Sequence, residues 1–324
     1  MITVPLAYYS DGLKLEGMLH VPDDLAAGER RPAVIICSGF QGLKEWVPAR
    51  WWPSFLARGF PVMAFDYRGF GTSEGARGRM FPEEEIRDVM ASITCLQQQP
   101  HVDPDRIGLL GWGLGGGIVV AVTARDRRVH ATACVNGLGN AGRTVRDAVP
   151  YPDWLALQNR LATDRVQRVL TGKSAALPAH EVTHPGRSRE RADYRQFDQD
   201  LAEIGKQAIP AFTLESADAY YRFRPEEEVA RISPRPLLIV HGDRNVFMPI
   251  DEALSLYARA QEPKELLIIP GAEHLEWIAP GSPLRQPYME RIVGWFAAQL
   301  GLTVPSRANG SPDAIGSPPA GADG

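Results

Sequence analysis

The chain has 324 residues, 44% of them hydrophobic, which is enough to bury the core of one large α/β domain or of one domain with an insertion. A formal net charge of −4, with no basic stretch interleaved with aromatic residues, excludes nucleic acid as the expected partner. No apolar run approaches the roughly 20 residues of a membrane span, and residues 1–5 lack the pattern of a signal peptide. Cys37, Cys95 and Cys134 have no metal-ligand spacing, so we expect buried free thiols, a cytoplasmic protein and no metal or cofactor.

Strands and helices are expected to alternate along the first 136 residues. Two strand-like runs, 4–9 and 13–21, flank Ser10-Asp11-Gly12, a good hairpin turn. The other expected strands are 32–37, 61–65, 107–110 and 131–135, and the expected helices are 51–58, 83–98 and 118–124. This alternation predicts an α/β fold with a mostly parallel sheet and helices on both faces.

The pattern changes between residues 137 and 231. This stretch is charged and helical in parts (154–170, 194–206 and 216–221), with no obvious strand, and it predicts a mainly helical cap over the carboxyl ends of the strands. Beyond it we expect strands 236–240 and 265–269 and helices 252–260 and 288–300. The predicted organisation is therefore a core of residues 1–136 and 232–303, a cap of 137–231 and a tail of 304–324. The tail, rich in Gly, Pro, Ser and Ala, is expected to be disordered.

The most informative motif is the turn Gly111-Trp112-Gly113-Leu114-Gly115, which follows an apolar run and precedes a helix-like run. That is the layout of the nucleophile elbow, G-x-S-x-G, with Gly113 where the nucleophile should stand. The same stretch also spells G-x-G-x-x-G, the dinucleotide fingerprint. Nucleotide binding is disfavoured because the motif lies in mid-chain and the next strand ends in Asn136, where an acid should hold the ribose.

Four further motifs accompany the elbow in chain order: Ser38-Gly39-Phe40, Asp66-Tyr67-Arg68-Gly69-Phe70-Gly71, His241-Gly242-Asp243-Arg244-Asn245 and Gly271-Ala272-Glu273-His274. With them the chain resembles the α/β-hydrolase superfamily, particularly its capped bacterial branches near the dienelactone hydrolases, the prolyl-oligopeptidase relatives and the FrsA-like esterases. The resemblance covers roughly residues 1–300. It implies an α/β-hydrolase fold with a cap, and it makes the four motifs the oxyanion loop, the D-x-R-G-x-G turn, the acid loop and the histidine loop.

The resemblance also implies a degenerate catalytic triad. Gly113 stands where Ser or Cys would attack, Asn245 stands where an aspartate would orient the histidine, and His274 alone is intact. Without a hydroxyl at position 113, no acyl-enzyme can form on that residue. An amide at position 245 can accept a ring N–H but cannot stabilise an imidazolium by charge, a loss that reaches about ten-thousand-fold in serine proteases.

Other residues are considered for the site. The backbone N–H groups of Phe40 and Leu114 are expected to form the oxyanion hole. Asp243 and Ser38 are possible substitutes for the missing triad groups, although a plain loop serine is the favoured interpretation of Ser38. His241 is expected to be a satisfied histidine at the end of its strand. Candidates for substrate binding are Trp112, Tyr220 and Tyr221.

Three functional hypotheses remain open from the sequence. The first is a small-molecule enzyme acting on a carbonyl substrate (an ester, a thioester or a C–C bond) without a serine nucleophile, by lyase- or cyclase-like chemistry or by water activated at His274. The second is an engineered serine-to-glycine knockout of a serine hydrolase. The third is a non-catalytic binding protein, which an intact His274 disfavours. The expected substrate is a mostly apolar small molecule, and family analogy suggests a homodimer.

Overall fold

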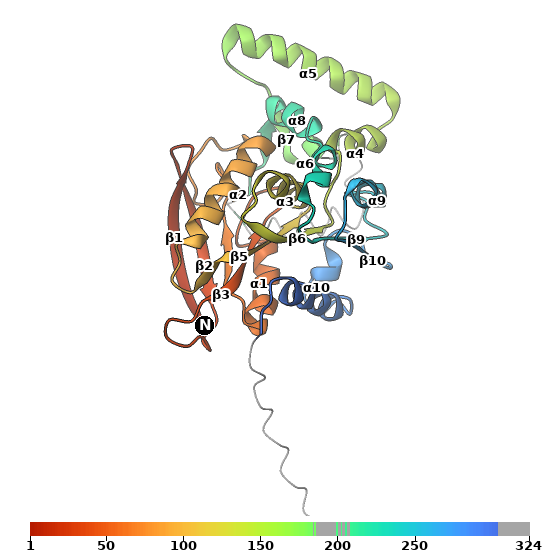
Figure 1. The fold of residues 1–324 in the computed structure, drawn as a ribbon. Helices are drawn as coiled ribbons and strands as arrows, with labels where there is room; N and C mark the ends of the chain where they lie inside the picture. The colour runs from red at the N-terminus through yellow and green to blue at the C-terminus, as the bar shows by residue number, and fades with distance from the viewer. Residues whose placement is uncertain (184, 186–198, 200–201, 203–204, 206–207, 304–324) are drawn as a thin grey trace, which may run out of the picture.

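The computed structural model describes residues 1–183, 185, 199, 202, 205 and 208–303 (Figure 1). Its centre is an eight-stranded sheet with the order β1-β2-β4-β3-β5-β6-β9-β10. The β1–β2 and β2–β4 pairs are antiparallel, and all other neighbours are parallel. The strands are β1 (Ile2–Ser10), β2 (Leu13–Val21), β3 (Arg31–Cys37), β4 (Val62–Phe65), β5 (Val102–Trp112), β6 (Val129–Val135), β9 (Leu237–Gly242) and β10 (Lys264–Ile269).

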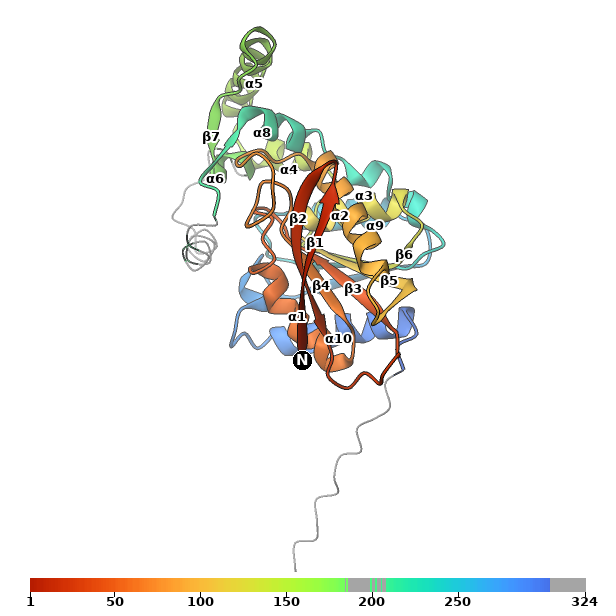
Figure 2. The same ribbon diagram turned by 90° about the vertical axis from the view of Figure 1, so that its left-hand side faces the viewer.

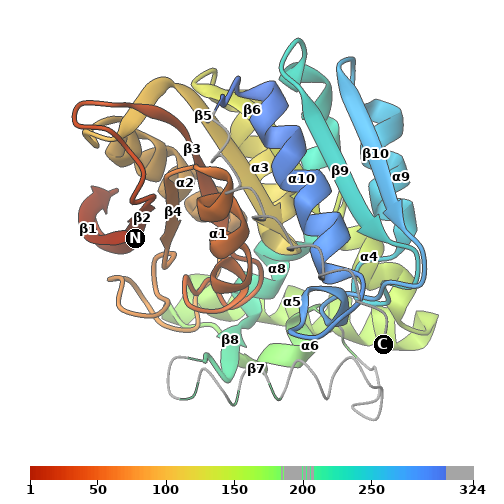
Figure 3. The same cartoon turned by 90° about the horizontal axis from the view of Figure 1, so that it is seen from below.

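Helices cover both faces of this sheet, which is why every residue of β3, β4 and β9 is buried. One face carries α1 (Val47–Arg58) and α10 (Arg285–Gln299), seen in front of the sheet in Figure 3. The other face carries α2 (Pro82–Gln97), α3 (Leu114–Arg125) and α9 (Ile250–Arg259) (Figure 1). The predicted α/β-hydrolase architecture, a mostly parallel sheet between two helical layers, is confirmed.

The residues between β6 and β9 lie outside the central sheet. They form α4 (Ala141–Ala148), α5 (Tyr151–Thr171), α6 (Ala179–Thr183), α8 (Leu214–Tyr221) and the short 3-10 turns η2 (Pro225–Glu227) and η3 (Val229–Ile232). Helix α5 projects from the body (Figures 1 and 2). Two short strands that were not obvious in the sequence, β7 (Ala176–Pro178) and β8 (Ala211–Thr213), pair antiparallel with each other and do not join the central sheet. Three residues per strand are too few for a detectable alternation. The expected helix 194–206 and the tail 304–324 fall mainly or wholly outside the described residues.

Several helices begin earlier than the apolar periodicity indicated. Helix α1 starts at Val47 rather than residue 51, and α5 starts at Tyr151 rather than residue 154. Both have a proline in the first turn, where the missing N–H has no intrahelical partner to lose. The first turns carry little apolar pattern, so periodicity alone placed these starts too late.

A buried ion-pair network fixes the point where the chain leaves β6 for α4. Glu252 of α9 is 1% exposed and accepts hydrogen bonds from the backbone N–H groups of Gly139 (2.8 Å) and Asn140 (2.7 Å). Arg143 of α4 binds the carboxylates of Glu252 and Glu226, each at 2.9 Å. The buried carboxylates of Glu226 and Glu252 are therefore both paired with Arg143, which ties α4 to η2 and α9.

No helix in the described part of the chain is long and apolar enough to cross a membrane. The described residues also hold no group of three or more His, Cys, Asp or Glu side chains placed to bind a metal ion. Cys37 and Cys134 are fully buried free thiols, and burial raises the pKa of each to about 12. Such thiols are unreactive at neutral pH.

Candidate active site

The turn expected to be the nucleophile elbow lies between β5 and α3. Gly113 joins β5 to α3 with φ 57° and ψ −120°, a positive-φ conformation that residues with a side chain rarely adopt. Its N–H donates to the Val135 carbonyl of β6 (3.0 Å), and its carbonyl accepts from the N–H of Gly116 (3.0 Å). The turn is therefore held by hydrogen bonds at both ends, independently of any side chain at position 113.

Close packing explains the other glycines of the turn. A Cβ on Gly111 would overlap the carbonyl of Gly115, and one on Gly115 would overlap the Ser38 carbonyl and lie 2.7 Å from the Cys37 oxygen. A Cβ on Gly39 would lie 2.6 Å from the Trp112 oxygen. The elbow and the loop after β3 thus touch backbone to backbone, which only glycine allows.

Gly113 differs from these glycines, because space remains where its side chain would be. An added Cβ would lie 3.5 Å from His274 Nε2 and 3.6 Å from His274 Cε1, ordinary van der Waals distances, and it would meet no backbone atom within 4 Å. A serine hydroxyl on that carbon would be within hydrogen-bond reach of the ring nitrogen. The vacant position and the histidine therefore face each other as nucleophile and base do in a triad.

Asn245 fixes the tautomer of His274. Its Oδ1 accepts hydrogen bonds from the backbone N–H groups of Phe247 (3.1 Å) and Met248 (3.0 Å), so this atom is the amide oxygen. His274 Nδ1 lies 3.2 Å from the same oxygen. An acceptor at this place assigns the ring proton to Nδ1, which leaves the Nε2 lone pair directed at Gly113. Asn245 thus orients the imidazole as an aspartate would, but without a charge.

Asn136 positions the histidine loop from the other side. It is fully buried at the end of β6, with φ 47°. Its Nδ2 donates to the His274 carbonyl (2.9 Å), and its Oδ1 accepts from the N–H of Gly242 (3.0 Å). In the sequence, Asn136 stands out only as the place where a ribose-binding acid is missing. The available signal was an Asn directly after a buried strand, since Asn tolerates left-handed backbone better than most residues.

Phe40 and Leu114, whose N–H groups are the expected oxyanion hole, lie at the same place in the fold. Both residues line one cavity together with Gly113 and His274. Leu114 is the first residue of α3, so its N–H has no intrahelical acceptor. The cavity measures about 40 Å³, and the rest of its lining is mainly apolar: Gly39, Trp46, Val47, Trp112, Thr183, Phe247, Met248 and Leu275. It suits a neutral, apolar group beside a carbonyl.

A side-chain clamp joins the loop after β3 to the segment that leads into β8. Gln41, fully buried and with φ 81°, donates from Nε2 to the Ile209 carbonyl (2.9 Å) and accepts from the Ile209 N–H at Oε1 (2.7 Å). Next to it, the rings of Phe40 and Phe212 of β8 lie 4.9 Å apart. The oxyanion loop and the returning cap strand are thus fixed to each other.

The substitution Gln41→Ala should lower the free energy of unfolding by about 2–3 kcal/mol, because it leaves the buried N–H and C=O of Ile209 without these partners. In the variant we also expect the Ile209 amide to exchange its hydrogen faster than in the unmodified protein, with a larger increase than at the amides of β5. Denaturant titration and exchange mass spectrometry measure both effects. Unchanged exchange at Ile209 would show that the clamp does not hold the cap strand.

Several sequence-based candidates are not at the site. Asp243 accepts a hydrogen bond from the Gly271 N–H (2.7 Å), whereas the partner at His274 Nδ1 is Asn245, so Asp243 does not replace the triad acid. Tyr220 and Tyr221 are almost completely buried in the cap and do not line the cavity. Both residues belong to α8, and their rings pack in the apolar core. From the sequence alone, a core position cannot be distinguished from a position in a pocket wall.

Trp112, Ser38 and His241 are placed as follows. Trp112 lines the cavity, and its ring centroid lies 5.6 Å from that of His274. Ser38 is 1% exposed, and its Oγ has no hydrogen-bond partner among the described residues, but it is not part of the cavity lining. His241 Nε2 is 2.7 Å from the Met248 carbonyl, and burial lowers the pKa of this histidine to about 4, so the ring is neutral and donates there.

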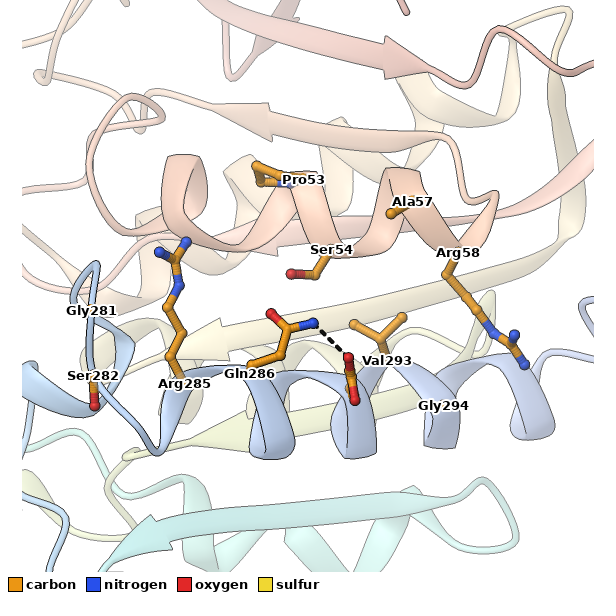
Figure 4. Close-up of a pocket in the computed structure, with 11 residues that line it drawn as sticks. Pro53, Ser54, Ala57, Arg58, Gly281, Ser282, Arg285, Gln286, Val293 and Gly294 are labelled. Atoms are coloured by element: carbon orange, nitrogen blue, oxygen red, sulfur yellow. Dashed lines mark hydrogen bonds between the residues drawn. The ribbon is translucent and has the colours of Figure 1, made fainter. Parts of the chain in front are cut away.

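A second hollow lies apart from this site, between α1 and α10 (Figure 4). It is a groove of about 810 Å³ with Arg58 and Arg285 among its lining side chains. It shares no residue with the cavity at Gly113, and no candidate site residue lines it. The candidate site residues Phe40, Gly113, Leu114 and His274 therefore all line the smaller cavity and not the groove.

Comparison with known proteins agrees with this geometry. The family model described as "Serine aminopeptidase, S33" (Hydrolase_4) matches residues 28–277, which include the elbow, the acid loop and His274. The chain belongs to this family. The resemblance to the α/β-hydrolase superfamily is thereby confirmed, and the family is one of α/β-hydrolase-fold enzymes.

Members of known sequence are related to this chain at moderate identity. An uncharacterised protein of Pseudomonas aeruginosa, PA2218, is 28% identical over 299 residues, covering 89% of this chain and 78% of that protein. The thiohydrolase AneE of Aspergillus aculeatus is 28% identical, covering 79% and 81%. The polyketide transferase GrgF of a Penicillium species is 27% identical, covering 83% and 87%.

Solved structures show the same fold. The crystal structure of PA2218 superposes with a TM-score of 0.77 at 26% identity, covering 92% of this chain and 94% of that one. The structure of DcsB in complex with its substrate analogue has a TM-score of 0.78 at 19% identity, covering 93% and 100%. At that identity the second likeness concerns the fold alone.

Proposed function

We propose that the protein is a small-molecule enzyme that acts on a carbonyl substrate without forming a covalent intermediate. His274 is its general base, and the N–H groups of Phe40 and Leu114 stabilise the oxyanion. The observation that carries the proposal is the 3.5 Å between His274 Nε2 and the position of the absent Cβ at Gly113. This distance directs the ring nitrogen at the elbow, in the cavity that Phe40 and Leu114 also line, and a substrate group held in that cavity would be within its reach.

The chemistry follows from this arrangement. A substrate carbonyl with its oxygen between the two N–H groups is polarised, and each donor contributes about 3–4 kcal/mol to stabilising the oxyanion. His274 Nε2 then removes a proton, either from a nucleophile in the Gly113 space or from carbon next to the carbonyl. The first gives ester or thioester cleavage, and the second gives the enolate of a lyase- or cyclase-like reaction. General-base catalysis of this kind contributes about 10²–10⁴-fold.

The substrate class we propose is an acyl ester or thioester with an apolar acyl group. Aromatic and aliphatic side chains dominate the cavity, and none of its described lining residues is Asp, Glu, Lys or Arg. Two relatives are named a thiohydrolase and a polyketide transferase, names that refer to acyl chemistry. We also keep two proposals from the sequence, a cytoplasmic location and a homodimer, the latter to be checked by light scattering of the purified protein.

The test is turnover of a panel of short and aromatic esters and N-acetylcysteamine thioesters. We expect slow hydrolysis or another product, and a decrease of about 10²–10⁴-fold in the variant His274→Ala. Asp243→Ala, on the neighbouring loop, is the matched control and should keep its activity. Tight binding of panel compounds without any turnover would instead support the non-catalytic receptor hypothesis.

A further inference from the structure

We propose that α5 is the interface of a homodimer, in which it pairs antiparallel with α5 of a second copy about a two-fold axis between Arg160 and Leu161. The inference rests on the homodimer proposed above and assigns its interface, and it does not depend on the chemistry proposed for His274. Helix α5 has 21 residues and projects from the body of the molecule (Figures 1 and 2). A helix of this length spans about 30 Å, enough for several layers of contacts with a partner helix.

Helix α5 carries most of the exposed apolar side chains. Five of the nine large hydrophobic side chains that are exposed among the described residues belong to it, and two of them, Val169 and Leu170, are 87% and 74% exposed. The other three are Tyr151, Leu155 and Val166. Apolar side chains gathered on one element, rather than scattered singly over the surface, indicate a face that a partner covers.

The attachment of α5 to the cap uses a different side of the helix. Leu157 and Leu161 are buried. Arg165 and Arg168 form ion pairs with Asp218 of α8, at 2.6 Å and 3.3 Å. The contact with α8 therefore holds the helix in place without covering its exposed apolar side chains.

These side chains form one stripe along the helix. Pro152, Asn159 and Ala162 are also exposed and fill the gaps between the five apolar residues. The eight positions follow one another at intervals of three and four, which places them on one side of an α-helix. We call them the α5 stripe. It contains no charged residue.

The order of residues in the α5 stripe is self-complementary. Positions equally far from the point midway between residues 160 and 161 pair as Tyr151 with Leu170, Pro152 with Val169, Leu155 with Val166, and Asn159 with Ala162. Two copies related by a two-fold axis through that point make each of these contacts twice. An interface that is the same patch on both subunits requires this kind of symmetry, and a lipid surface does not.

The spacing and the single amide also fit a short antiparallel coiled coil. Alternating intervals of three and four positions keep the same side of each helix toward its partner. Asn159 is the one polar residue of the α5 stripe, and it meets Ala162, whose small side chain leaves room for the amide. A shift of seven positions in either direction would place Asn159 against Val169 or Leu155. One polar residue in an apolar seam thus selects this register.

Light scattering over a wide range of concentrations, with a charged variant, tests the interface. We expect the mass of two chains for the unmodified protein. Val166→Glu would place a carboxylate against Leu155 of the second copy and should raise the dissociation constant of the dimer about 100-fold or more. Leu254→Glu on α9 is the matched control, because Leu254 is also an exposed hydrophobic residue, and this variant should remain a dimer. Both substitutions are at exposed positions, so both variants should fold.

Disulfide formation tests the antiparallel pairing. In the double variant Leu155→Cys with Val166→Cys, mild oxidation should give a covalent dimer, whereas the unmodified protein with its three cysteines should give none. The two positions are about 16 Å apart along one helix, too far for a disulfide within a chain. Each single variant should stay uncross-linked, because position 155 meets position 166 and not itself. A covalent dimer of either single variant would show parallel pairing and would contradict the proposal.

The remaining outcomes separate this proposal from the others. A dimer that persists unchanged in Val166→Glu would overturn the interface while the homodimer stands. A monomer at every concentration would overturn both, and its binding to phosphatidylcholine vesicles, if lost in Val166→Glu, would assign the α5 stripe to a lipid surface. Ester turnover is measured separately, and its absence would overturn the function proposed for His274 without affecting the assignment of α5.

Discussion

Restoring a hydroxyl at position 113 should make the protein reactive toward fluorophosphonates, which are expected to leave the unmodified chain unlabelled. In Gly113→Ser the new Oγ would lie beside His274 Nε2, since the Cβ position is 3.5 Å away and free of clashes. Gly113 already has the positive φ of an elbow residue, so the serine needs no neighbour to move, although a side chain at this φ costs about 1–3 kcal/mol in backbone strain. Gly172→Ser is the control, because Gly172 also has positive φ (72°) but has no atom within 4 Å of its Cβ position, and that serine should stay unlabelled.

Efficient ester turnover should need Asn245→Asp as well. A carboxylate at this position keeps the three contacts made by Asn245 Oδ1, and backbone N–H donors favour the charged form. Its second oxygen replaces Nδ2, which lies 3.5 Å from His241 Nε2. Asn245→Asp should raise the rate of ester turnover by up to about 10⁴-fold in the Gly113→Ser variant. The increase should be far smaller in the unmodified chain, because residues of a triad act as a unit.

The measurement is ester turnover and labelling by the two single variants and the double variant, after folding has been checked by circular dichroism. Simple additivity of the two changes would show that positions 113 and 245 do not act together through His274. A folded double variant that neither labels nor hydrolyses any simple ester would contradict the assignment of the elbow.

Replacing Gly115 by alanine should be strongly destabilising, although alanine is normally the better helix former. The new Cβ would overlap the Ser38 carbonyl and lie 2.7 Å from the Cys37 oxygen, both backbone atoms at the end of β3. Such atoms move only with the strand, so we expect a loss of about 3 kcal/mol or more in the free energy of unfolding.

Gly294 of α10 is the matched control for this prediction. It is also helical, but nothing lies within 4 Å of its Cβ position. Gly294→Ala should therefore stabilise the protein by about 0.5–1 kcal/mol. Urea unfolding of both variants gives the comparison. Equal effects of the two substitutions would mean that the elbow and the oxyanion loop are not in backbone contact.

The architecture was predictable because its signals are long and repeated. Alternating apolar runs and amphipathic stretches indicated the parallel sheet, and five motifs in chain order placed the elbow, His274 and Asn245 near one another. What could not be predicted depends on contacts between distant segments. The bond between Gln41 and Ile209, and that between Asn136 and the His274 carbonyl, join residues more than a hundred positions apart. Neither leaves a local pattern.

The place of Tyr220 and Tyr221 has a similar cause. Aromatic residues in a helix are expected to be buried, but whether they face a cavity or an apolar core depends on what packs against them. Asn245 is the opposite case. Its departure from aspartate was evident in the sequence, but its consequence for the tautomer needed the two backbone N–H donors that identify its oxygen.

The central claim is turnover at His274 without a covalent intermediate on the protein, and intact-mass spectrometry during turnover tests it most directly. The reaction is quenched at short times with an ester or thioester that the protein consumes, in parallel with the variant His274→Ala. We expect product to accumulate while the protein keeps its unmodified mass, and turnover to fall about 10²–10⁴-fold in the variant. An acyl adduct that forms and decays at the turnover rate, mapped to Ser38, Thr183 or another side chain, would contradict the account.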